Sequence, residues 1–425
     1  MTLAAMGSTG VRVPRTGLKD LSMNHTVSIS DLGAELDSRR EQLAITILMP
    51  CLNEEETLGR CIQKAQSSLQ RLNVQGEVLI ADNGSTDGSV EIAERLGARV
   101  VRVREKGYGN ALRAGIEGAR GTWIVMGDAD DSYDFANIET FVAKLAQGFD
   151  LVMGCRMPSG GGKIMVGAMP WKHRWLGNPV LSWIGRVFFK CPVRDFHCGL
   201  RAFHKQAYLE MDLRTTGMEF ASEMVIKATL KSLRIGEVPI TLYKDGRSRP
   251  PHLRSWRDGW RHLRFMLLFS PTWLFLVPGL ALMLLGCGFG LRLVAGPLKV
   301  GVFGFDTNTL LVCSMAVILG LQVCLFGLFT RMFATTEGLL PQQAVVQRLS
   351  SFLTLERGLV LGLLLLVFGG AQLVGAFLYW QAASFGSISY PESLRKVIPA
   401  VTLITLGVQV VFSSFFLSIL GLPRK

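Results

Sequence analysis

The sequence lacks the cysteine spacing that would hold a zinc ion or a disulfide framework. Its eight cysteines include no Cys-x-x-Cys pair, and three of them lie inside long apolar segments. Zinc sites and the disulfide scaffolds of small secreted domains depend on closely spaced cysteines. We therefore expect reduced thiols in a cytosolic domain and in membrane helices.

A nucleic-acid-binding motif is also missing, although the net charge is +12. The densest group of basic residues comes directly before the first long apolar segment. Basic clusters at that place are typical of contact with anionic lipid. We therefore expect membrane lipid, and no nucleic acid, as a partner.

Residues 1–43 contain no long apolar core of the kind that a secretory signal needs. We interpret them as a flexible N-terminal extension with a short helix near Ile29–Leu43. No internal repeat follows. We expect an α/β domain over residues 44–250, an amphipathic segment over 251–271 and a membrane region over 272–425.

Four apolar segments dominate the C-terminal part of a chain that is 49% hydrophobic. Each is long enough to cross a bilayer as a helix, which takes about 20 residues. None has Lys, Arg, Asp or Glu in its middle, which argues against an ion or proton pathway. The predicted spans are Trp273–Leu291, Thr309–Phe329, Gly358–Trp380 and Val397–Leu420.

Basic residues are concentrated on one side of these spans, and the side with more of them is expected in the cytoplasm. That side holds Lys244, Arg247, Arg249, Arg254, Arg257, Arg261, Arg264, Arg331, Arg348, Arg357, Arg424 and Lys425, whereas the other holds Arg292, Lys299, Arg395 and Lys396. We expect an integral protein of the cytoplasmic (inner) membrane, with the α/β domain and both termini in the cytoplasm.

The segment before the first span has apolar residues at three- and four-residue steps, with arginines on the other face. These residues are Leu253, Trp256, Trp260, Leu263 and Leu267. The pattern is typical of an amphipathic helix in the membrane interface. An ordinary helix packed on the preceding domain is the alternative.

Strands and helices alternate along the α/β domain, which predicts parallel βαβ units in a doubly wound sheet. The expected strands are Ala44–Met49, Glu77–Ala81, Arg99–Val103, Gly121–Met126, Asp150–Gly154, Gly199–His204 and Glu237–Leu242. The expected helices are Glu55–Arg71, Ser89–Leu96, Asn110–Ala119, Asn137–Ala146 and Glu219–Ser232. We expect Met157–Lys172, which is rich in Gly, Pro and Ser, to be a loop.

The fourth of these strands is followed by two acidic residues, Asp128 and Asp130, separated by Ala129. Ligands of open α/β sheets bind at the carboxyl edge, and alternate residues of an extended chain point the same way. Two such carboxylates suit Mg²⁺ or Mn²⁺, which bind through one or two carboxylates plus substrate phosphates. This predicts metal-assisted transfer from a diphosphate-linked donor, although an acidic turn or helix cap would have the same sequence.

Three motifs in this order resemble glycosyltransferase family 2. They are Pro50-Cys51-Leu52-Asn53-Glu54-Glu55, Asp82-Asn83-Gly84-Ser85-Thr86-Asp87 and Asp128-Ala129-Asp130. The chain is most similar to the polyprenyl-phosphate glycosyltransferases, such as dolichol-phosphate mannose synthase and bactoprenol glucosyltransferase. The resemblance covers roughly Thr46 to Leu268. It implies a Rossmann-like GT-A domain that binds a nucleotide-sugar, followed by an α-helical transmembrane domain of four spans.

The resemblance also implies roles for individual residues. Those expected to bind the nucleotide-sugar are Pro50, Asn53, Glu54, Asp82, Ser85, Asp87, Lys106, Asp128, Ala129 and Asp130. Asp128 and Asp130 would hold the Mg²⁺ or Mn²⁺ ion, and Lys106 lies in a Lys-Gly-x-Gly loop. Many relatives have Asp at the position of Asn83, so the role of Asn83 is left open.

Two further elements match the family downstream, Gly154-Cys155-Arg156 and Asp195-Phe196-His197-Cys198-Gly199-Leu200-Arg201. By this resemblance Arg156, Arg201, Arg247 and Arg249 would contact acceptor phosphate. The expected catalytic set is Asp128, Asp130, Arg156, Asp195 and Arg201. Arginine is well shaped for two-point contacts with phosphate.

The acceptor determines whether a general base is needed. Glu219 and Glu223 lie four residues apart on a predicted helix, and a sugar hydroxyl acceptor would require an acid of this kind as base. A lipid phosphate is already anionic and needs none. The resemblance therefore implies inversion at the anomeric carbon, with transfer to undecaprenyl or dolichyl phosphate in cell-envelope glycan biosynthesis.

Two other functions remain open at this stage. A processive polysaccharide synthase would carry Gln-x-x-Arg-Trp, whereas Arg174-Trp175 follows Trp171. A non-catalytic translocase or scaffold conflicts with the uncharged spans and with the intact pair of aspartates. The sequence leaves open a UDP- or GDP-linked donor, the sugar, and whether the protein forms a homo-oligomer.

Overall fold

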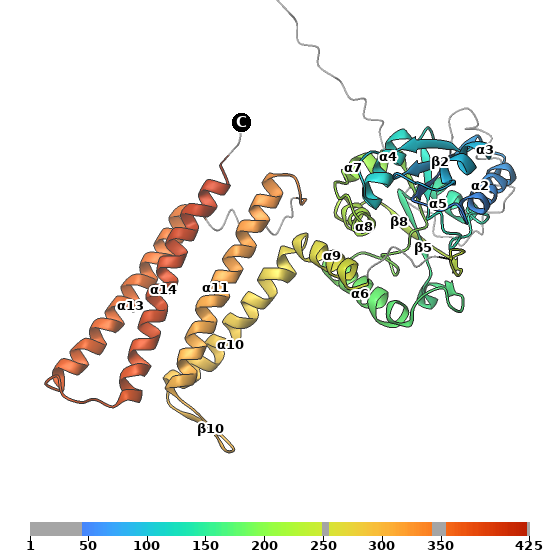
Figure 1. Ribbon diagram of the computed structural model, residues 1–425. Helices are drawn as coiled ribbons and strands as arrows, with labels where there is room; N and C mark the ends of the chain where they lie inside the picture. Colours follow the sequence, from blue (N-terminus) through green and yellow to red (C-terminus); the bar gives the residue numbers. More distant parts are fainter. Residues whose placement is uncertain (1–44, 249–254, 342–353, 423–425) are drawn as a thin grey trace, which may run out of the picture. The chain divides into compact units, whose positions relative to one another are not determined.

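The computed structural model describes residues 45–248, 255–341 and 354–422. The expected N-terminal extension and its helix near Ile29–Leu43 lie outside these ranges. Figure 1 labels the main helices and strands of the chain. The described residues form an α/β domain and a set of long apolar helices.

The α/β domain is built on a seven-stranded sheet with strand order β3-β2-β1-β4-β7-β5-β8. Its strands are β1 (Ile45–Cys51), β2 (Gly76–Asp82), β3 (Arg99–Arg102), β4 (Trp123–Met126), β5 (Leu151–Cys155), β7 (Arg201–His204) and β8 (Ile235–Pro239). The expected strands are confirmed to within a few residues. Alternating strand and helix segments therefore identified the α/β class correctly.

The predicted parallel βαβ arrangement does not extend to β7, which runs antiparallel to both β4 and β5. The chain leaves β5 at Cys155, and Arg201 at the start of β7 pairs with Met126 at the end of β4. Both ends of the connection therefore lie at the carboxyl edge of the parallel strands, and β7 has to run back. This places residues 156–200 along the edge at which α/β sheets bind ligands.

Helices cover both faces of the sheet. Their bounds are α2 (Leu58–Leu72), α3 (Ser89–Arg95), α4 (Tyr108–Gly118), α5 (Glu139–Ala146), α7 (Lys205–Met211) and α8 (Phe220–Leu230). Alternate strand residues such as Leu48, Ile124 and Met126 form one core with α4 and α8. The buried side of α2 lies outside that core, so it packs against the opposite face.

The connection between β5 and β7 is more ordered than the sequence predicts. The expected loop Met157–Lys172 contains a short turn, η1 (Pro158–Gly160), and strand β6 (Lys163–Ile164). β6 pairs with β9 (Thr241–Leu242), so the expected strand Glu237–Leu242 divides between two sheets. A helical turn η2 (His173–Gly177) and helix α6 (Asn178–Phe189) follow, and the sequence analysis assigned neither.

Helix α9 (Ser255–Leu268) precedes the membrane region. Asp258, His262, Phe265 and Met266 are buried on one side, and the last two belong to the core of the α/β domain. The opposite side carries Trp256 and Trp260, which are 91% and 58% exposed. The helix therefore packs on the domain and presents the two tryptophans of the predicted apolar stripe outward, whereas Leu263 and Leu267 are half-buried and Leu253 lies outside the described residues.

Four helices of the described chain are long and apolar enough to cross a membrane, as predicted. They cover Thr272–Val294, Thr307–Thr336, Leu355–Ala382 and Tyr390–Leu420. The first consists of η3 (Thr272–Leu276) continuing into α10 (Val277–Val294), and the others are α11, α13 and α14; Figure 1 labels the four α-helices. A hairpin of β10 (Leu298–Val300) and β11 (Phe303–Phe305) joins α10 to α11.

Small residues allow these helices to approach closely. A side chain on Gly320 of α11 would lie 2.7 Å from the carbonyl oxygen of Gly279 in α10. A side chain on Gly407 of α14 would lie 2.9 Å from the carbonyl oxygen of Gly362 in α13. Glycine at such contacts is typical of membrane helix pairs, which associate largely through van der Waals packing.

Candidate functional site

The predicted donor residues meet at the carboxyl edge of β1, β2 and β4. Asp82 is the last residue of β2 and pairs in register with Cys51, the last residue of β1. Asp128 follows the end of β4 by two residues, and β4 is the other neighbour of β1. The fold therefore brings the three motifs together at the edge where α/β sheets bind ligands.

Asp128 contacts the first residue of helix α4. Its Oδ1 accepts a hydrogen bond from the hydroxyl of Tyr108 at 3.0 Å. Burial, with the negative charge of Asp130 as the second cause, raises the pKa of Asp128 to about 6. Both causes disfavour the ionised form of Asp128, which a bound cation would favour.

Asp130 is buried and held in a defined orientation. Its Oδ1 accepts hydrogen bonds from the backbone N–H of Ser132 at 3.0 Å and from the Ser132 hydroxyl at 2.5 Å. Its Oδ2 accepts from Nη2 of Arg247 at 2.8 Å. The third acid of the run, Asp131, has φ of +61° and pairs with Lys64 of helix α2.

Residues 243–248, here called the closing segment, run along this edge. The N–H of Tyr243 donates to the carbonyl of Ser132, and the N–H of Gly246 donates to the carbonyl of Asp130. Arg247 donates to Glu54 at 3.0 Å and to Asp130 at 2.8 Å. Although burial alone would lower it, these carboxylates and Asp245 raise the pKa of Arg247.

Several predicted nucleotide-binding residues tie the loops after β1 and β2 together. The N–H of Asn53 donates to Oγ of Ser85, and Oδ1 of Asn53 accepts from the N–H of Thr86. Asp82 accepts from the N–H of Ser85 at 3.1 Å. Asp87 accepts from the N–H groups of Ser89 and Glu55. These side chains thus give the edge its shape.

The remaining members of the predicted nucleotide set differ in exposure. Pro50 is half-buried at the end of β1, and Ala129 is only 2% exposed. The carbonyl of Ala129 accepts a hydrogen bond from the hydroxyl of Thr57 at 2.7 Å. Lys106 is exposed in the loop before α4.

Asn83, whose role the sequence left open, fixes the Lys-Gly loop. Its Nδ2 donates to the carbonyl of Glu105 at 2.8 Å, and its Oδ1 accepts from the N–H of Gly107 at 2.7 Å. An ionised aspartate has no proton to donate to that carbonyl. The amide therefore makes two bonds, of which a carboxylate would make one.

Arg156 and Asp195 form a buried ion pair beside this edge. Nε and Nη2 of Arg156 donate to Asp195 at 2.7 and 2.8 Å, and Asp195 is fully buried. Despite burial, which would lower it, Asp195 raises the pKa of Arg156 well above its usual range. Nη1 of Arg156 makes a longer contact of 3.5 Å with the hydroxyl of Tyr133.

Arg201 is fully buried, and its guanidinium faces the backbone. Nη2 donates to the carbonyl of Cys198 at 2.6 Å, and Nη1 donates to the carbonyl of Ala221 at 2.9 Å. Burial lowers its pKa. This arrangement suits a positioning residue better than the direct phosphate contact that the family resemblance implies. Arg249, predicted for the same role, lies outside the described residues.

The two glutamates at the start of α8 have different surroundings. Glu223 accepts from the N–H groups of Arg214 and Thr215 and pairs with Lys227 at 2.9 Å. Its carboxylate therefore stabilises the fold through these contacts. Glu219 has a buried Oε2 without a hydrogen-bond partner among the described residues.

A second polar cluster links α8 to α9. The hydroxyl of Ser222 lies 2.7 Å from Nδ1 of His262 and 3.4 Å from Nε2 of His197. The two imidazole rings are 4.6 Å apart and nearly perpendicular. Burial lowers the pKa of both histidines, that of His197 well below its usual value. Both are therefore neutral near pH 7.

Sequence reasoning missed the two tyrosines that hold this edge. Tyr108 donates to Asp128, and the hydroxyl of Tyr133 accepts from the N–H of Gly199 at 2.9 Å. Tyr108 lies inside the Lys-Gly-x-Gly loop, but that motif does not specify the residue between the glycines. Nothing in the local sequence around Tyr133 indicates its partner, which lies on a distant segment.

The carboxylate oxygens at this edge suit a divalent cation that also binds substrate. The described residues contain no cluster of three or more His, Cys, Asp or Glu side chains arranged as a metal cage. Asp128 and Asp130 offer two hard oxygen ligands beside a surplus of negative charge. Mg²⁺ typically takes one or two carboxylates and completes its shell with phosphates and water, so the two residues fit such an ion.

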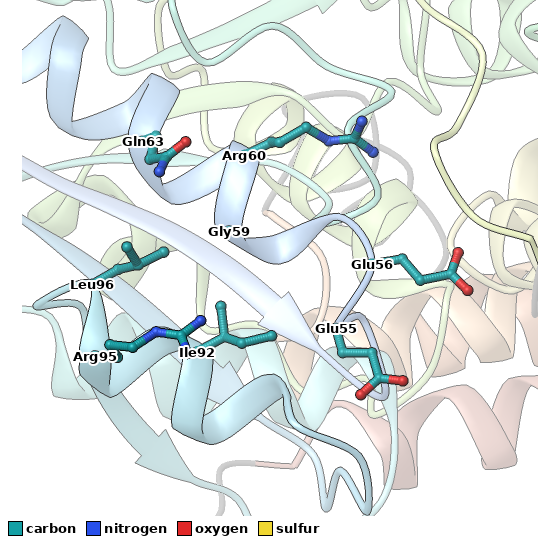
Figure 2. A pocket seen from close by; sticks show the side chains of 8 residues that line it. All are labelled: Glu55, Glu56, Gly59, Arg60, Gln63, Ile92, Arg95 and Leu96. Carbon is teal, nitrogen blue, oxygen red and sulfur yellow. The ribbon is translucent and has the colours of Figure 1, made fainter.

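A shallow cavity of about 390 Å³ opens elsewhere, between α2 and α3 (Figure 2). Glu55, Glu56, Arg60 and Arg95 give its lining charges of both signs. No residue of the predicted nucleotide, catalytic or acceptor sets lines it. We therefore place the candidate site at the strand edge and not in this cavity.

Fold and site together define a membrane-bound transferase with a GT-A-like domain. Residues 46–210 match Glycosyl transferase family 2, and residues 328–421 match the glycosyltransferase family 2 C-terminal transmembrane region. The chain is 36% identical over 382 residues to the low-salt glycan biosynthesis hexosyltransferase Agl6 of Haloferax volcanii, with 89% of each chain covered. The protein belongs to glycosyltransferase family 2.

Two further similarities are more limited. A dolichyl-phosphate hexose transferase of Haloferax volcanii is 26% identical over 197 residues, which are 46% of this chain and 81% of that protein. Glucosyl-3-phosphoglycerate synthase from Mycobacterium tuberculosis, solved with Mn²⁺ and UDP, is similar at 21% identity with a TM-score of 0.44. That similarity covers 58% of this chain and 84% of the other.

Proposed function

We propose that the protein transfers a hexose or N-acetylhexosamine from a UDP- or GDP-sugar to polyprenyl phosphate. The observation that carries the proposal is the pair Asp128 and Asp130 at the carboxyl edge of β4, in a family 2 domain joined to four apolar helices. The names of the relatives, a hexosyltransferase and a dolichyl-phosphate hexose transferase, support a hexose and a lipid phosphate.

On the donor side, the loops after β1 and β2 bind the nucleotide. Asn53, Ser85 and Asp87 are proposed to shape this pocket because they take part in hydrogen bonds between the two loops, and Asp82 because it fixes the second loop at Ser85. Pro50, Glu54, Ala129 and Lys106 complete the proposed set. Lys106 is exposed and free to approach the diphosphate.

Asp128 and Asp130 are proposed to hold Mg²⁺ or Mn²⁺ together with the donor diphosphate. When bound, the ion offsets the negative charge that develops on the departing nucleoside diphosphate. Arg247 contacts Asp130 at 2.8 Å. We propose that Arg247 changes partner from Asp130 to substrate phosphate when the donor binds.

On the acceptor side, the lipid phosphate oxygen attacks the anomeric carbon. The bond from that carbon to the diphosphate breaks, the nucleoside diphosphate leaves with the electron pair, and the configuration inverts. No general base is needed because the phosphate is already ionised. Arg156 offers its Nη1 edge to the phosphate, whereas Asp195 and Arg201 act as positioning residues that hold it and β7 in place.

The side of the membrane follows from the basic residues. Five basic residues of the described chain precede the first span, namely Lys244, Arg247, Arg257, Arg261 and Arg264. Cytoplasmic flanks of membrane helices are enriched in Lys and Arg. We propose that the α/β domain faces the cytoplasm, where nucleotide-sugars are available, and that the four spans of the described residues return the chain after α14 to the same side.

The experiment is sugar transfer by the purified full-length protein. It is incubated with a short polyprenyl phosphate, Mg²⁺ or Mn²⁺, and each of a panel of radiolabelled UDP- and GDP-sugars. We expect label in an acid-labile lipid, with one donor preferred. Asp130→Asn should lower the rate by about 100-fold or more, since a charge that assists departure of the diphosphate is lost.

Asp134→Asn is the matched control, because Asp134 is on the same loop and only bonds locally to Ala136 and Asn137. Its rate should stay near that of the unmodified protein. Label in a growing polymer would instead identify a polysaccharide synthase. Absence of transfer from every donor by folded protein would refute the proposed acceptor.

A further inference from the structure

The turn before helix α4, residues 105–109, is held by the side chain of Asn83. The amide of Asn83 bonds to both neighbours of Lys106. Its Nδ2 donates to the carbonyl of Glu105 at 2.8 Å, and its Oδ1 accepts from the N–H of Gly107 at 2.7 Å. The backbone on either side of Lys106 is therefore fixed by one residue of the loop after β2.

The opposite side of the turn packs against the segment before α8. The N–H of Gly109 donates to the carbonyl of Thr216 at 3.0 Å. Gly107 has φ of +139°, and a side chain there would collide with the same carbonyl oxygen. Glycine adopts such a backbone conformation without strain, whereas residues with a side chain rarely do. The turn therefore lies against this backbone on one side and against Asn83 on the other.

The turn connects the proposed nucleotide loop to the acidic pair. Asn83 directly follows Asp82, the last residue of β2, whose carboxylate fixes the loop proposed to bind the nucleotide. At the other end of the turn, Tyr108 donates to Oδ1 of Asp128 at 3.0 Å. A nucleotide-sugar with its nucleoside at the β2 loop and its diphosphate at Asp128 spans these two points. Lys106 lies on the segment of chain that joins them.

The two polar side chains differ in what they are free to contact. Lys106 is exposed, and an ammonium group binds phosphate as a point charge on a flexible stem. The backbone that carries such a stem decides which positions its charge can reach. Asn83 is only 7% exposed, and the turn engages both polar atoms of its amide. This favours a positioning role for Asn83 over direct contact with the nucleotide.

We propose that Asn83 is a positioning residue for donor binding, which holds the turn so that the ammonium of Lys106 contacts the donor diphosphate. An amide suits this place because it donates to one carbonyl and accepts from one N–H, whereas a carboxylate only accepts. The inference rests on the proposed function for the class of donor, a nucleotide-sugar. It does not depend on the identity of the acceptor.

The test is the affinity of the purified full-length protein for UDP and for GDP, each with Mn²⁺, measured by isothermal titration calorimetry. Lys106→Met should weaken binding about 10- to 100-fold, the effect expected for one hydrogen bond to a charged group. Asn83→Ala should weaken binding about 10-fold, because the turn loses two hydrogen bonds that hold it. The double variant should bind as Lys106→Met alone does, because Asn83 acts through Lys106.

Asn83→Asp gives a second measurement with a side chain of nearly the same size. The ionised carboxylate cannot donate to the carbonyl of Glu105, whereas the protonated carboxyl can. Since burial favours the protonated form, affinity relative to the unmodified protein should recover as the pH is lowered from about 8 to about 5.5. The recovery should be absent when Lys106→Met is also present. Asn73→Asp is the matched control, because Asn73 is exposed at the end of α2, and its affinity should follow that of the unmodified protein at every pH.

The outcomes separate this inference from the proposed function. Equal affinities of Lys106→Met and the double variant support it, as does recovery at low pH that requires Lys106. If the two losses multiply, if the recovery persists without Lys106, or if Lys106→Met binds as tightly as the unmodified protein, the inference is wrong. If the unmodified protein binds neither nucleotide, the proposed donor is wrong and the inference fails with it. If binding follows the expected pattern but no sugar reaches polyprenyl phosphate, only the proposed acceptor is wrong.

Discussion

Replacing Asp195 by asparagine should destabilise the α/β domain strongly. Asp195 is fully buried and accepts from Nε, Nη2 and the backbone N–H of Arg156, at 2.7, 2.8 and 3.0 Å. Asparagine leaves the buried guanidinium without a counter-charge. Breaking a buried ion pair in this way costs roughly 3–5 kcal/mol. For a domain of this size, we expect the apparent melting temperature to fall by about 6–20 °C.

The chain contains a matched exposed pair. Arg214 donates to Asp212 at 3.0 and 2.7 Å, and both side chains are more than half exposed. Asp212 has φ of +49°, which asparagine also adopts readily. Asp212→Asn should therefore leave the melting temperature close to that of the unmodified protein, because water and salt screen exposed pairs.

The assay is thermal unfolding of the detergent-purified full-length chain, followed by near-ultraviolet circular dichroism. Equal shifts for Asp195→Asn and Asp212→Asn would refute the reasoning, since burial is the only difference it invokes. The double variant Arg156→Met with Asp195→Leu should recover most of the lost stability but not transfer activity. Replacing a whole buried pair by apolar groups is often close to neutral.

Three further outcomes are expected. Burial lowers the pKa of His262 from its usual 6.5. The unfolded chain therefore takes up this proton at a higher pH than the folded chain does, and the melting temperature should fall as pH drops below about 6.5. His262→Gln should reduce this dependence of the melting temperature on pH. A side chain on Gly199 would lie 2.6 Å from Oδ2 of Asp128, so Gly199→Ala should abolish transfer. Gly59→Ala, where the nearest atoms are 3.6 Å away, should leave transfer unchanged. Gly320→Leu should separate α10 from α11 and give aggregated protein by size-exclusion chromatography, while Gly288→Leu, with nothing within 4 Å, should remain monodisperse.

Local sequence patterns determined most of the secondary structure. The 3.6-residue spacing of Leu58, Ile62, Ala65 and Leu69 predicted helix α2, and these residues are buried as expected. The four spans were recognisable because a lipid-crossing helix needs an unbroken apolar run, which few other structures require. The placement of Asp128 and Asp130 directly after a strand was also predicted, because these residues follow a short apolar run in the sequence.

The direction of β7 could not be read from its residues, since a buried strand has the same composition in either direction. It depends on where the chain re-enters the sheet, and therefore on the path of residues 156–200. Helix α6 was missed for a related reason. Its outward tryptophans and inward Gly185 contradict the usual rule that apolar residues face the core.

The tertiary structure decided which polar residues contact one another and which role each can take. The sequence by itself determined the α/β class, the four spans, the family and the acidic pair Asp128 and Asp130, because these depend on periodicity, length and short motifs. It did not determine that Arg201 faces backbone carbonyls or that Arg247 pairs with Asp130, more than a hundred residues earlier in the chain. Such pairings depend on distances between segments far apart in the chain, which are fixed only when the sheet and its helices pack together.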